Sequence, residues 1–351
     1  MKKAFLYAYD RQNLGDDLFV RHIARRYPHV QFYMWSDAIN RRVFADVPNL
    51  KIIDKDSKFV QLLHKLRPSL AARYKEWMEK RCDAVGYIGG SIFMEYPNWA
   101  QICTWWDWTA QNRPFYILGA NFGPYHTEAY REKMAEIFAM CRDVCFRDKY
   151  SANLFPGVVR CAPDILFGYP MPKAEVKQDQ IFVSVINCAG RDESHDLKAH
   201  DARYVANMAG LLRQLLDSGK KLVLASFCKD EGDEEGIRKI LAALGAENDP
   251  RMQVLCYDGT NADELTMAIA ESAGVIGTRF HATILAMAAG RPVLPIIYSD
   301  KTKHVLEDLG FEGAVFDLRC DAPWAPAQMS AIVPPVAEVE GHFAKLDQVL
   351  K

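Results

Sequence analysis

Short apolar runs alternate with amphipathic stretches along most of the chain. The first run, Lys3–Tyr9, is followed by a loop and by a helical pattern that reaches about Tyr27. This alternation is typical of β-α units, in which helices cover a parallel sheet. In the first half, the pattern predicts further strands at Gln31–Trp35, Lys51–Asp54, Asp83–Gly89, Pro114–Gly119, Asp143–Asp148 and Val158–Cys161.

A break then separates two halves of the chain. Gly168–Gln180 contains two prolines and mixed charge without an apolar period, which predicts a linker. After the break the alternation resumes. Strands are predicted at Ile181–Asn187, Lys221–Phe227, Gln253–Tyr257, Ala273–Gly277 and Pro292–Ile297, and helices at Ala202–Ser218, Glu234–Leu244, Ala262–Glu271 and His281–Ala289.

This organisation predicts an α/β protein of two Rossmann-like, doubly wound halves that face a cleft. The expected domains are residues 1–170 and 178–335, and residues 336–351 are expected to form a proline-started helix that packs back on the first domain. In such sheets ligands bind beyond the carboxyl ends of the strands. Candidate functional residues are therefore sought in the loops that follow strands.

Composition narrows the function classes. The 351 residues include 43 Lys and Arg against 45 Asp and Glu, so a net charge of −2 provides no global field for nucleic acid or an anionic membrane. Neither a bilayer-spanning run nor a signal peptide is recognisable. Nine scattered cysteines without a C-x-x-C pair indicate reduced thiols in the cytoplasm and no metal site. The oligomeric state is left open.

The first candidate loop is Asn13-Leu14-Gly15-Asp16-Asp17. Gly15 permits a tight turn, and Asp16 or Asp17 is expected to cap the following helix. Two adjacent acids exceed what one cap needs, so these carboxylates are also candidates for binding sugar hydroxyls.

Small residues follow the next two strands. Gly89-Gly90-Ser91 and the Gly119–Gly123 loop with Asn121 would let a ligand approach the backbone closely. Ser91 is either a helix cap or a ligand contact, and Asp164 is either a site residue or a loop hydrogen-bonding group. Asp148, three residues before Ser151, is expected to be a helix cap.

Four of the seven tryptophans lie in Trp99–Trp108. Aromatic faces can stack on sugar rings, but a helix that packs them into the core or against another subunit is the favoured interpretation.

The most informative segment is Gly274–Ile297. Its strand ends at Gly277, and Thr278, Arg279 and His281 lie where the next helix begins. A helix N-terminus and a guanidinium together favour an anion, especially a phosphate or carboxylate. His281 beside a bound phosphate would act as a general acid or base at neutral pH.

Lys301, after the next strand, is either a second cation for that anion or a solvated side chain. If Lys301 is that second cation, a local cationic pocket is predicted between Arg279 and Lys301, although the total charge of the chain is close to zero. The acidic run Asp230–Glu235 is expected to begin a helix, whose dipole it would complement, rather than to bind a metal.

Taken together and in this order, these loops resemble the polysaccharide pyruvyl transferase family. The matching segments run from Asn13 to about Gly310, and the last of them carries most of the specificity. They are NLGDD, GGS, GANFGP, Arg-Asp with a following Ser, APD and GTRFHATILAMAAGRPVLPIIYSDK.

The resemblance implies a glycosyltransferase-B-like fold, with the acceptor on the first domain and the donor on the second. It implies transfer of a pyruvyl group from phosphoenolpyruvate, a co-substrate, to a sugar of a bacterial cell-surface polysaccharide or its precursor, which forms a ketal. No metal or other cofactor is implied. A lipid-linked acceptor, and with it a peripheral position at the inner face of the membrane, is left open.

Carried over by position, the family's Arg-x-His pair falls on Arg279 and His281, and its lysine falls on Lys301. The arginine would bind the charged groups of the donor, and the histidine would act in acid catalysis or phosphate binding. The family's further donor-binding arginine is replaced here by Asn187, and Arg191 is its candidate substitute. Asp16, Asp17 or Asp164 would serve the acceptor.

Two other functions stay open at this stage. The same fold suits a glycosyltransferase that uses a nucleotide sugar, with its diphosphate at the helix N-terminus. A glycan-binding relative without catalytic activity is the third class, and Asn187 in place of the expected arginine is the feature that supports it.

Overall fold

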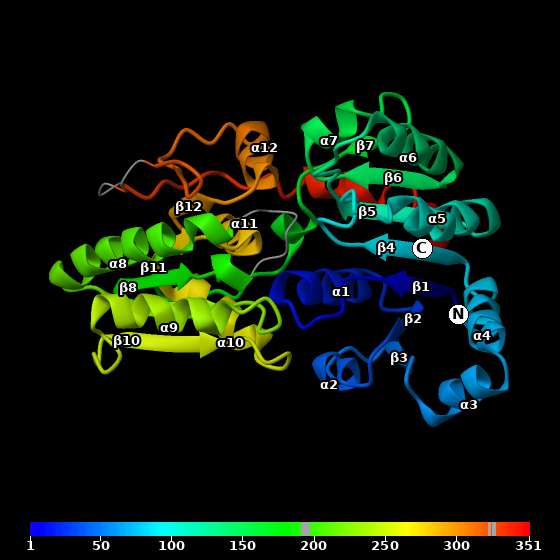
Figure 1. Cartoon of the computed structure of the whole chain (residues 1–351), viewed down its shortest axis with the longest axis horizontal. Helices are drawn as coiled ribbons and strands as arrows, with labels where there is room; N and C mark the ends of the chain where they lie inside the picture. The colour runs from blue at the N-terminus through cyan, green and yellow to red at the C-terminus, as the bar shows by residue number, and fades with distance from the viewer. Residues whose placement is uncertain (191–196, 322–323, 325–327) are drawn as a thin grey trace. The chain divides into compact units, whose positions relative to one another are not determined.

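Parallel β-sheets flanked by helices organise the chain in a computed structural model, which describes residues 1–190, 197–321, 324 and 328–351 (Figure 1). In the first sheet the strand order is β3-β2-β1-β4-β5-β6-β7, which runs outward from β1 in both directions as in doubly wound folds. Its strands are β1 (Lys3–Tyr7), β2 (Gln31–Ser36), β3 (Leu50–Asp54), β4 (Ala84–Ile88), β5 (Phe115–Ala120), β6 (Asp143–Phe146) and β7 (Arg160–Cys161). The accompanying helices are α1 (Leu14–Arg26), α2 (Asn40–Val43), α3 (Lys58–Leu66), α4 (Pro68–Lys80), α5 (Trp99–Asn112), α6 (Glu128–Met140) and α7 (Lys149–Asn153).

The second sheet has the order β10-β9-β8-β11-β12-β13, again with parallel pairs. Its strands are β8 (Lys177–Ser184), β9 (Lys221–Ser226), β10 (Met252–Cys256), β11 (Ser272–Gly277), β12 (Val293–Ile297) and β13 (Phe316–Asp317). Its helices are α8 (Asp201–Asp217), α9 (Asp233–Leu244), α10 (Ala262–Glu271), α11 (Phe280–Ala288) and α12 (Asp300–Asp308). Within the described part of the chain, no helix combines the length and the apolar character that a membrane crossing requires.

The chain divides into two compact units. Unit 1 contains residues 1–10, 16–165 and 337–351, and unit 2 contains residues 11–15 and 166–336. This division differs from the expected domain boundaries in two places. It falls at Ile165, a few residues earlier than expected, and the short Arg11–Gly15 segment belongs to the second unit.

The linker prediction was wrong over its last four residues. β8 begins at Lys177, and Lys177 and Gln180 pair with the neighbouring strands β11 and β9. The first three side chains of β8 are exposed, so this end of the strand carries charged residues and lacks an apolar period. Sequence periodicity therefore detects only the buried part of this strand.

The prediction of one continuous helix over residues 336–351 was also wrong. This segment forms a 3-10 helix (Glu338–Phe343) and a short α13 (Asp347–Leu350). The carbonyl of Gly341 accepts a hydrogen bond from Arg160 at 2.7 Å. This bond places the carbonyl against β7 instead of in a continuous helix. The segment, red in Figure 1, packs on β5 and β6 of unit 1.

Arg26 of α1 holds this segment in place. Its guanidinium donates to both carboxylate oxygens of Glu340 at 2.7 Å and to Asp347 at 2.8 Å, and it lies 4.2 Å from the ring centroid of Phe343. Burial would raise the pKa of Asp347, but hydrogen bonds from Arg26 and Tyr27 outweigh it and lower that pKa to about 2. The carboxylate is therefore charged at neutral pH.

The tryptophan-rich segment forms α5 and packs into the core of unit 1, as the favoured interpretation predicted. Trp106 is buried and stacks on Tyr87, with 4.8 Å between ring centroids, and Trp105 meets Tyr7 edge-on at the same distance. Six of the chain's seven tryptophans lie in unit 1, so tryptophan fluorescence reports mainly on that unit.

Buried His342 should make unit 1 less stable as the pH falls from about 6.5 to 4. Its Nε2 atom lies 2.8 Å from the carbonyl oxygen of Pro163, and burial lowers the pKa of His342 to about 4. Between these pH values the unfolded chain binds a proton that the folded chain does not, so the free energy of unfolding falls by up to about 3 kcal/mol and is unaffected above this window. Urea unfolding followed by tryptophan fluorescence measures the effect.

The His342→Gln variant should show a correspondingly shallower loss between pH 6.5 and 4. Its structural cost is measured at pH 7.5, where the histidine is neutral in both states, and is subtracted. An unchanged pH dependence in this variant would contradict the assignment.

Candidate active site

α11 begins directly beyond the carboxyl end of β11, as predicted. Thr278 follows the strand, and Arg279 precedes the helix with extended backbone (φ −68°, ψ 131°). A side chain at Gly277 would place its Cβ atom 2.3 Å from the Oγ1 atom of Thr283, so this turn requires glycine. The helix therefore presents the positive end of its dipole at the edge of the sheet.

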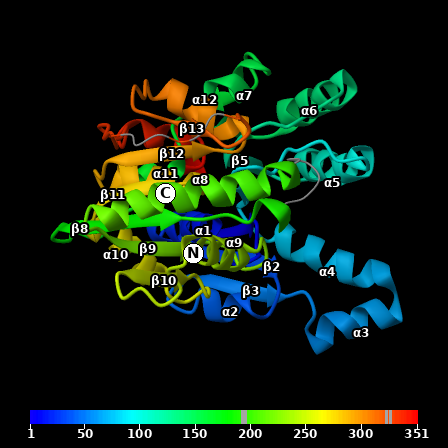
Figure 2. The ribbon, with the colours of Figure 1, turned by 60° about the vertical axis from the view of Figure 1, so that its left-hand side comes forward.

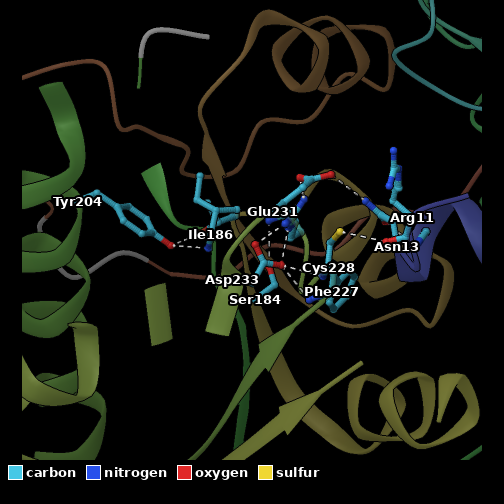
Figure 3. Close-up of polar contacts among 12 residues, drawn as sticks. Arg11, Asn13, Ser184, Ile186, Tyr204, Phe227, Cys228, Glu231 and Asp233 are labelled. Atoms are coloured by element: carbon cyan, nitrogen blue, oxygen red, sulfur yellow. Dashed lines mark hydrogen bonds and ion pairs between the residues drawn. The ribbon is translucent and has the colours of Figure 1, made fainter. Parts of the chain in front are cut away.

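The buried guanidinium of Arg279 is held by two carboxylates. Its Nε atom donates to Asp233 at 2.8 Å, one terminal nitrogen donates to the second oxygen of Asp233, and the other donates to Glu231. Burial would lower the pKa of Arg279, but the two acids outweigh it and raise that pKa well above its ordinary value. Figure 3 shows both acids with their contacts. We call Arg279, Glu231 and Asp233 the arginine cluster.

The arginine cluster changes the predicted electrostatics of this edge. The sequence predicted a cationic pocket from Arg279 to Lys301, but one guanidinium here faces two carboxylates. The donors of Arg279 are directed at these acids because a buried charge requires opposite charges and hydrogen bonds around it. Its role in binding an external anion stays a prediction.

Asp233 ties the ends of two strands together. It is fully buried at the start of α9, and one of its oxygens accepts from the backbone N–H groups of Phe227 and Cys228 at 2.9 and 3.0 Å. Phe227 follows β9, whereas Arg279 follows β11. The acidic run does begin a helix, as predicted, but sequence reasoning missed its function as the partner of Arg279.

The Arg11–Gly15 segment attaches to the same edge of unit 2. Leu14 donates its N–H to the carbonyl of Phe227 at 3.0 Å, and the side chain of Asn13 lies 3.4 Å from Glu231. Asn13 also accepts from the N–H of Gly15 at 3.1 Å. Asn13 is therefore the N-terminal cap of α1. The expected cap at Asp16 or Asp17 was wrong because the helix begins earlier, at Leu14.

Gly15 and His281 are in direct contact. A Cβ atom at Gly15 would lie 1.7 Å from Nδ1 of His281, which is far below any permitted contact. Gly15 has helical backbone within α1. It is therefore required for the space it leaves to the imidazole ring rather than for the tight turn that the sequence suggested.

The remaining predicted residues of this edge have separate surroundings. Thr278 is buried, and its hydroxyl lies 3.2 Å from that of Tyr204, which also accepts from the N–H of Ile186 at 3.3 Å. Lys301 lies in the first turn of α12, with its Nζ atom 5.4 Å from the ring centroid of Tyr298. Tyr204 was not predicted, and a lone tyrosine in a helical pattern carries no signal for it.

Asn187, which the resemblance predicts at the position of the family's arginine, lies beyond the end of β8. Its side-chain oxygen accepts from Lys239 at 3.0 Å, and Lys239 also pairs with Asp201 at 2.8 Å. A Cβ atom at Gly232 would lie 2.9 Å from the Asn187 amide nitrogen, so this position is tightly packed. Arg191, its candidate substitute, lies outside the described residues.

Four predicted residues of unit 1 gather around one buried arginine, Arg147. Its terminal nitrogens donate to Asp164 at 3.0 Å and to Asn121 at 2.7 Å, and Ser91 donates to Asn121 at 3.2 Å. A side chain at Gly90 would meet the guanidinium at 2.6 Å. We call Gly90, Ser91, Asn121, Arg147 and Asp164 the Arg147 cluster.

The Arg147 cluster shows the surroundings of two residues whose roles the sequence left open, and their roles as site residues stay predictions. Ser91 contacts Asn121 and is not a helix cap, and fully buried Asp164 pairs with Arg147. Asp148 caps α7, as predicted, by accepting from the N–H of Ser151 at 2.7 Å. Arg147 was missed as the centre of this cluster because a lone Arg-Asp pair has no specific signal.

Asp16 and Asp17 have different environments. Asp17 is fully buried, whereas Asp16 is half-buried. Burial first, then the charges of Asp16 and Asp10, raise the pKa of Tyr87 above its ordinary value. Asp16 therefore lies near the end of β4, where Gly89 and Gly90 follow the strand.

Adding one methyl group at Gly15 should displace His281 or destabilise α1. Such overpacking typically costs about 1–3 kcal/mol. We expect Gly15→Ala to lower the midpoint temperature of unfolding and to shift the NMR signal of the His281 ring. That signal is assigned by its absence from the spectrum of the His281→Gln variant. Helical Gly210 is the matched control because a Cβ atom there meets nothing within 4 Å. Gly210→Ala should be neutral or slightly stabilising, and equal effects of the two changes would contradict this account.

Removing the negative charge of Asp233 should leave Arg279 with a buried charge that is only partly compensated. Breaking such a pair costs about 3–5 kcal/mol. We expect Asp233→Asn to increase amide hydrogen exchange in β9 and β11, measured by mass spectrometry. Glu234→Gln removes the same charge in the same helical turn and should leave these amides protected. If both variants exchange alike, the arginine cluster does not hold these strands together.

Similarities to known proteins bear on this site. A family model described as polysaccharide pyruvyl transferase matches residues 13–300. AmsJ of Erwinia amylovora, an amylovoran biosynthesis protein, is 22% identical over 266 residues, which cover 68% of this chain and 62% of AmsJ. The match thus spans less than two thirds of that relative's length.

Among solved structures, the UDP-GlcNAc 2-epimerase of Neisseria meningitidis bound to UDP-GlcNAc superposes with a TM-score of 0.57 and 11% identity, over 99% of this chain and 92% of that one. Anabaena HepE in complex with UDP-glucose gives 0.55 and 11%, over 100% and 92%. These similarities establish the glycosyltransferase-B-like fold. The family model covers both the Asn13 loop and the Arg279–His281 turn, and this chain therefore belongs to the polysaccharide pyruvyl transferase family.

Proposed function

We propose that this protein transfers a pyruvyl group from phosphoenolpyruvate to a sugar of a bacterial cell-surface polysaccharide or its precursor, forming a ketal. The observation that carries this proposal is the family match over residues 13–300, which includes His281 and the residues that position it. The contact between Gly15 and His281 supports it, because it joins the first and the most specific of the matching motifs.

The donor is a small molecule with a phosphate and a carboxylate close together. Its phosphate would bind at the N-terminus of α11, where backbone N–H groups and the helix dipole favour an anion. Lys301 is the proposed second cation. Arg279 would take part by exchanging Glu231, the less buried of its two carboxylate partners, for an anionic group of the donor.

The proposed reaction requires one proton donor and one proton acceptor. His281 donates a proton to the methylene carbon of phosphoenolpyruvate, which becomes the methyl group of the ketal and leaves the central carbon electrophilic. One sugar hydroxyl bonds to that carbon, phosphate leaves as its C–O bond breaks, and a second hydroxyl completes the ketal. The two hydroxyl protons are released, which balances the proton taken from His281 and the one bound by phosphate.

Asp16 is the proposed base for the sugar hydroxyls. Of the two adjacent acids, Asp17 is fully buried, whereas Asp16 keeps access to solvent. Asp164 is less suited because its carboxylate already pairs with Arg147.

Loss of the His281 imidazole should lower kcat of pyruvyl transfer by about 10²–10⁴-fold, which is the usual contribution of a general acid. We expect His281→Gln to show this loss when phosphate release from phosphoenolpyruvate is followed with sugar acceptors. Exposed His29 provides the control, and His29→Gln should retain wild-type turnover.

A nucleotide panel in the same assay tests the alternative enzyme class. If the wild-type protein cleaves a nucleotide sugar and neither binds nor consumes phosphoenolpyruvate, it is a glycosyltransferase. Glycan binding that is unchanged in His281→Gln, without turnover of either donor, would instead identify a non-catalytic relative.

A further inference from the structure

The helix pair α3 and α4 exposes large apolar side chains to solvent. Phe59, Leu62 and Leu66 on α3 are 54%, 53% and 63% exposed, and Trp77 on α4 is 48% exposed. α4 packs against β1, and α3, drawn in blue beside it in Figures 1 and 2, lies at the periphery of unit 1. We call residues 58–81 the α3–α4 surface.

The exposed apolar residues of α3 share one face of the helix. Phe59, Leu62 and Leu66 are spaced by three and four residues, so they lie in one stripe. Val60, on a different side, is buried, and Ser57 caps the helix by accepting from the N–H of Val60 at 3.4 Å. α3 is thus anchored by one side while its apolar stripe is directed outward.

Excess positive charge surrounds this stripe. Residues 58–81 include seven Lys and Arg and two acids, Glu76 and Glu79, in a chain whose net charge is −2. Glu79 is buried and pairs with Arg113. Within the described structure, ion pairs are absent from the exposed basic residues of this surface. These residues are Lys58, Lys65, Arg67, Arg73, Lys80 and Arg81.

The combination of an exposed apolar stripe with flanking positive charge favours one class of binding partner over others. Nucleic acid would use the positive charge but not a stripe of leucine and phenylalanine. A second copy docked about a two-fold axis through this surface would bring the same positive charges together. A bilayer with anionic lipids uses both features, because apolar side chains enter the interface while Lys and Arg contact the headgroups.

We propose that the α3–α4 surface binds a bilayer that contains anionic lipids. Phe59, Leu62, Leu66 and Trp77 enter the boundary between headgroups and acyl chains, and the flanking basic residues bind the lipid phosphates. This proposal does not depend on the proposed reaction. The net charge of −2 excludes only a global attraction, and the attraction here is local.

Flotation with vesicles tests the proposal on the full chain. The wild-type protein should float with vesicles of phosphatidylglycerol and phosphatidylethanolamine but not with vesicles of phosphatidylcholine. Binding should weaken in 1 M NaCl, where the screening length falls to about 3 Å. Equal binding to both kinds of vesicle, or to neither, would overturn the proposal.

Two sets of variants separate charge from apolar insertion. Lys65→Gln, Arg67→Gln and Arg73→Gln together should weaken binding on the order of 100-fold, since each basic residue near the surface contributes about a factor of five. Phe59→Ser, Leu62→Ser and Leu66→Ser together should abolish it. Unchanged tryptophan fluorescence and urea midpoint would show that unit 1 remains folded.

The matched control removes the same charge from exposed positions elsewhere. Lys198→Gln, Lys303→Gln and Lys345→Gln together should leave binding to anionic vesicles unchanged. If this control weakens binding as much as the α3–α4 variant, the attraction is not local and the proposal fails. It also fails if the wild-type protein is a dimer that the serine variant converts to a monomer without any vesicle binding, because the surface would then join two copies.

Discussion

The buried ion cluster of Arg279, Asp233 and Glu231 is the interaction on which the candidate site in unit 2 depends. Asp233 accepts hydrogen bonds from two backbone N–H groups beyond β9 and from Arg279 beyond β11, while the N–H of Arg279 donates to Ser184 at the end of β8. Three strand ends are thus tied through one carboxylate and one arginine. A buried pair of this kind offsets the desolvation of its charges only while both partners are present. The loops at this edge therefore share one fixed arrangement.

The same arrangement recurs in unit 1, where Arg147 pairs with Asp164 at the corresponding edge of the sheet. In both units the guanidinium is buried and several backbone loops are arranged around it. Gly90 and Gly15 leave the space that Arg147 and His281 require. In each unit a glycine thus lets the backbone at a strand end or helix start approach one of these side chains closely.

Much of the fold could be predicted from the sequence, because apolar strands and amphipathic helices carry periodic signals. α10 begins and ends where the pattern predicted, and β11, the turn at Thr278 and α11 lie within a residue of their predicted bounds. The partners of Arg279 could not be predicted in this way. Asp233 lies 46 residues before Arg279, and their contact depends on β8 lying between β9 and β11, which is a property of strand order and not of local pattern. The exposed start of β8 and the broken C-terminal helix were missed for a related reason, because contacts with distant strands determine both.

The return of residues 337–351 to unit 1 has a consequence for biosynthesis. Arg26, the last residue of α1, and Tyr27 directly after it form an ion pair and a hydrogen bond with Asp347, which the ribosome adds more than 300 positions later. Domains generally fold as they emerge, in the order of synthesis. Here unit 1 is the first to begin and the last to be completed, and unit 2 is synthesised in full while its neighbour still lacks the segment that covers part of its core. The apolar surface of unit 1 that Val339, Phe343 and Leu346 cover therefore stays open on the nascent chain until this last segment has been synthesised.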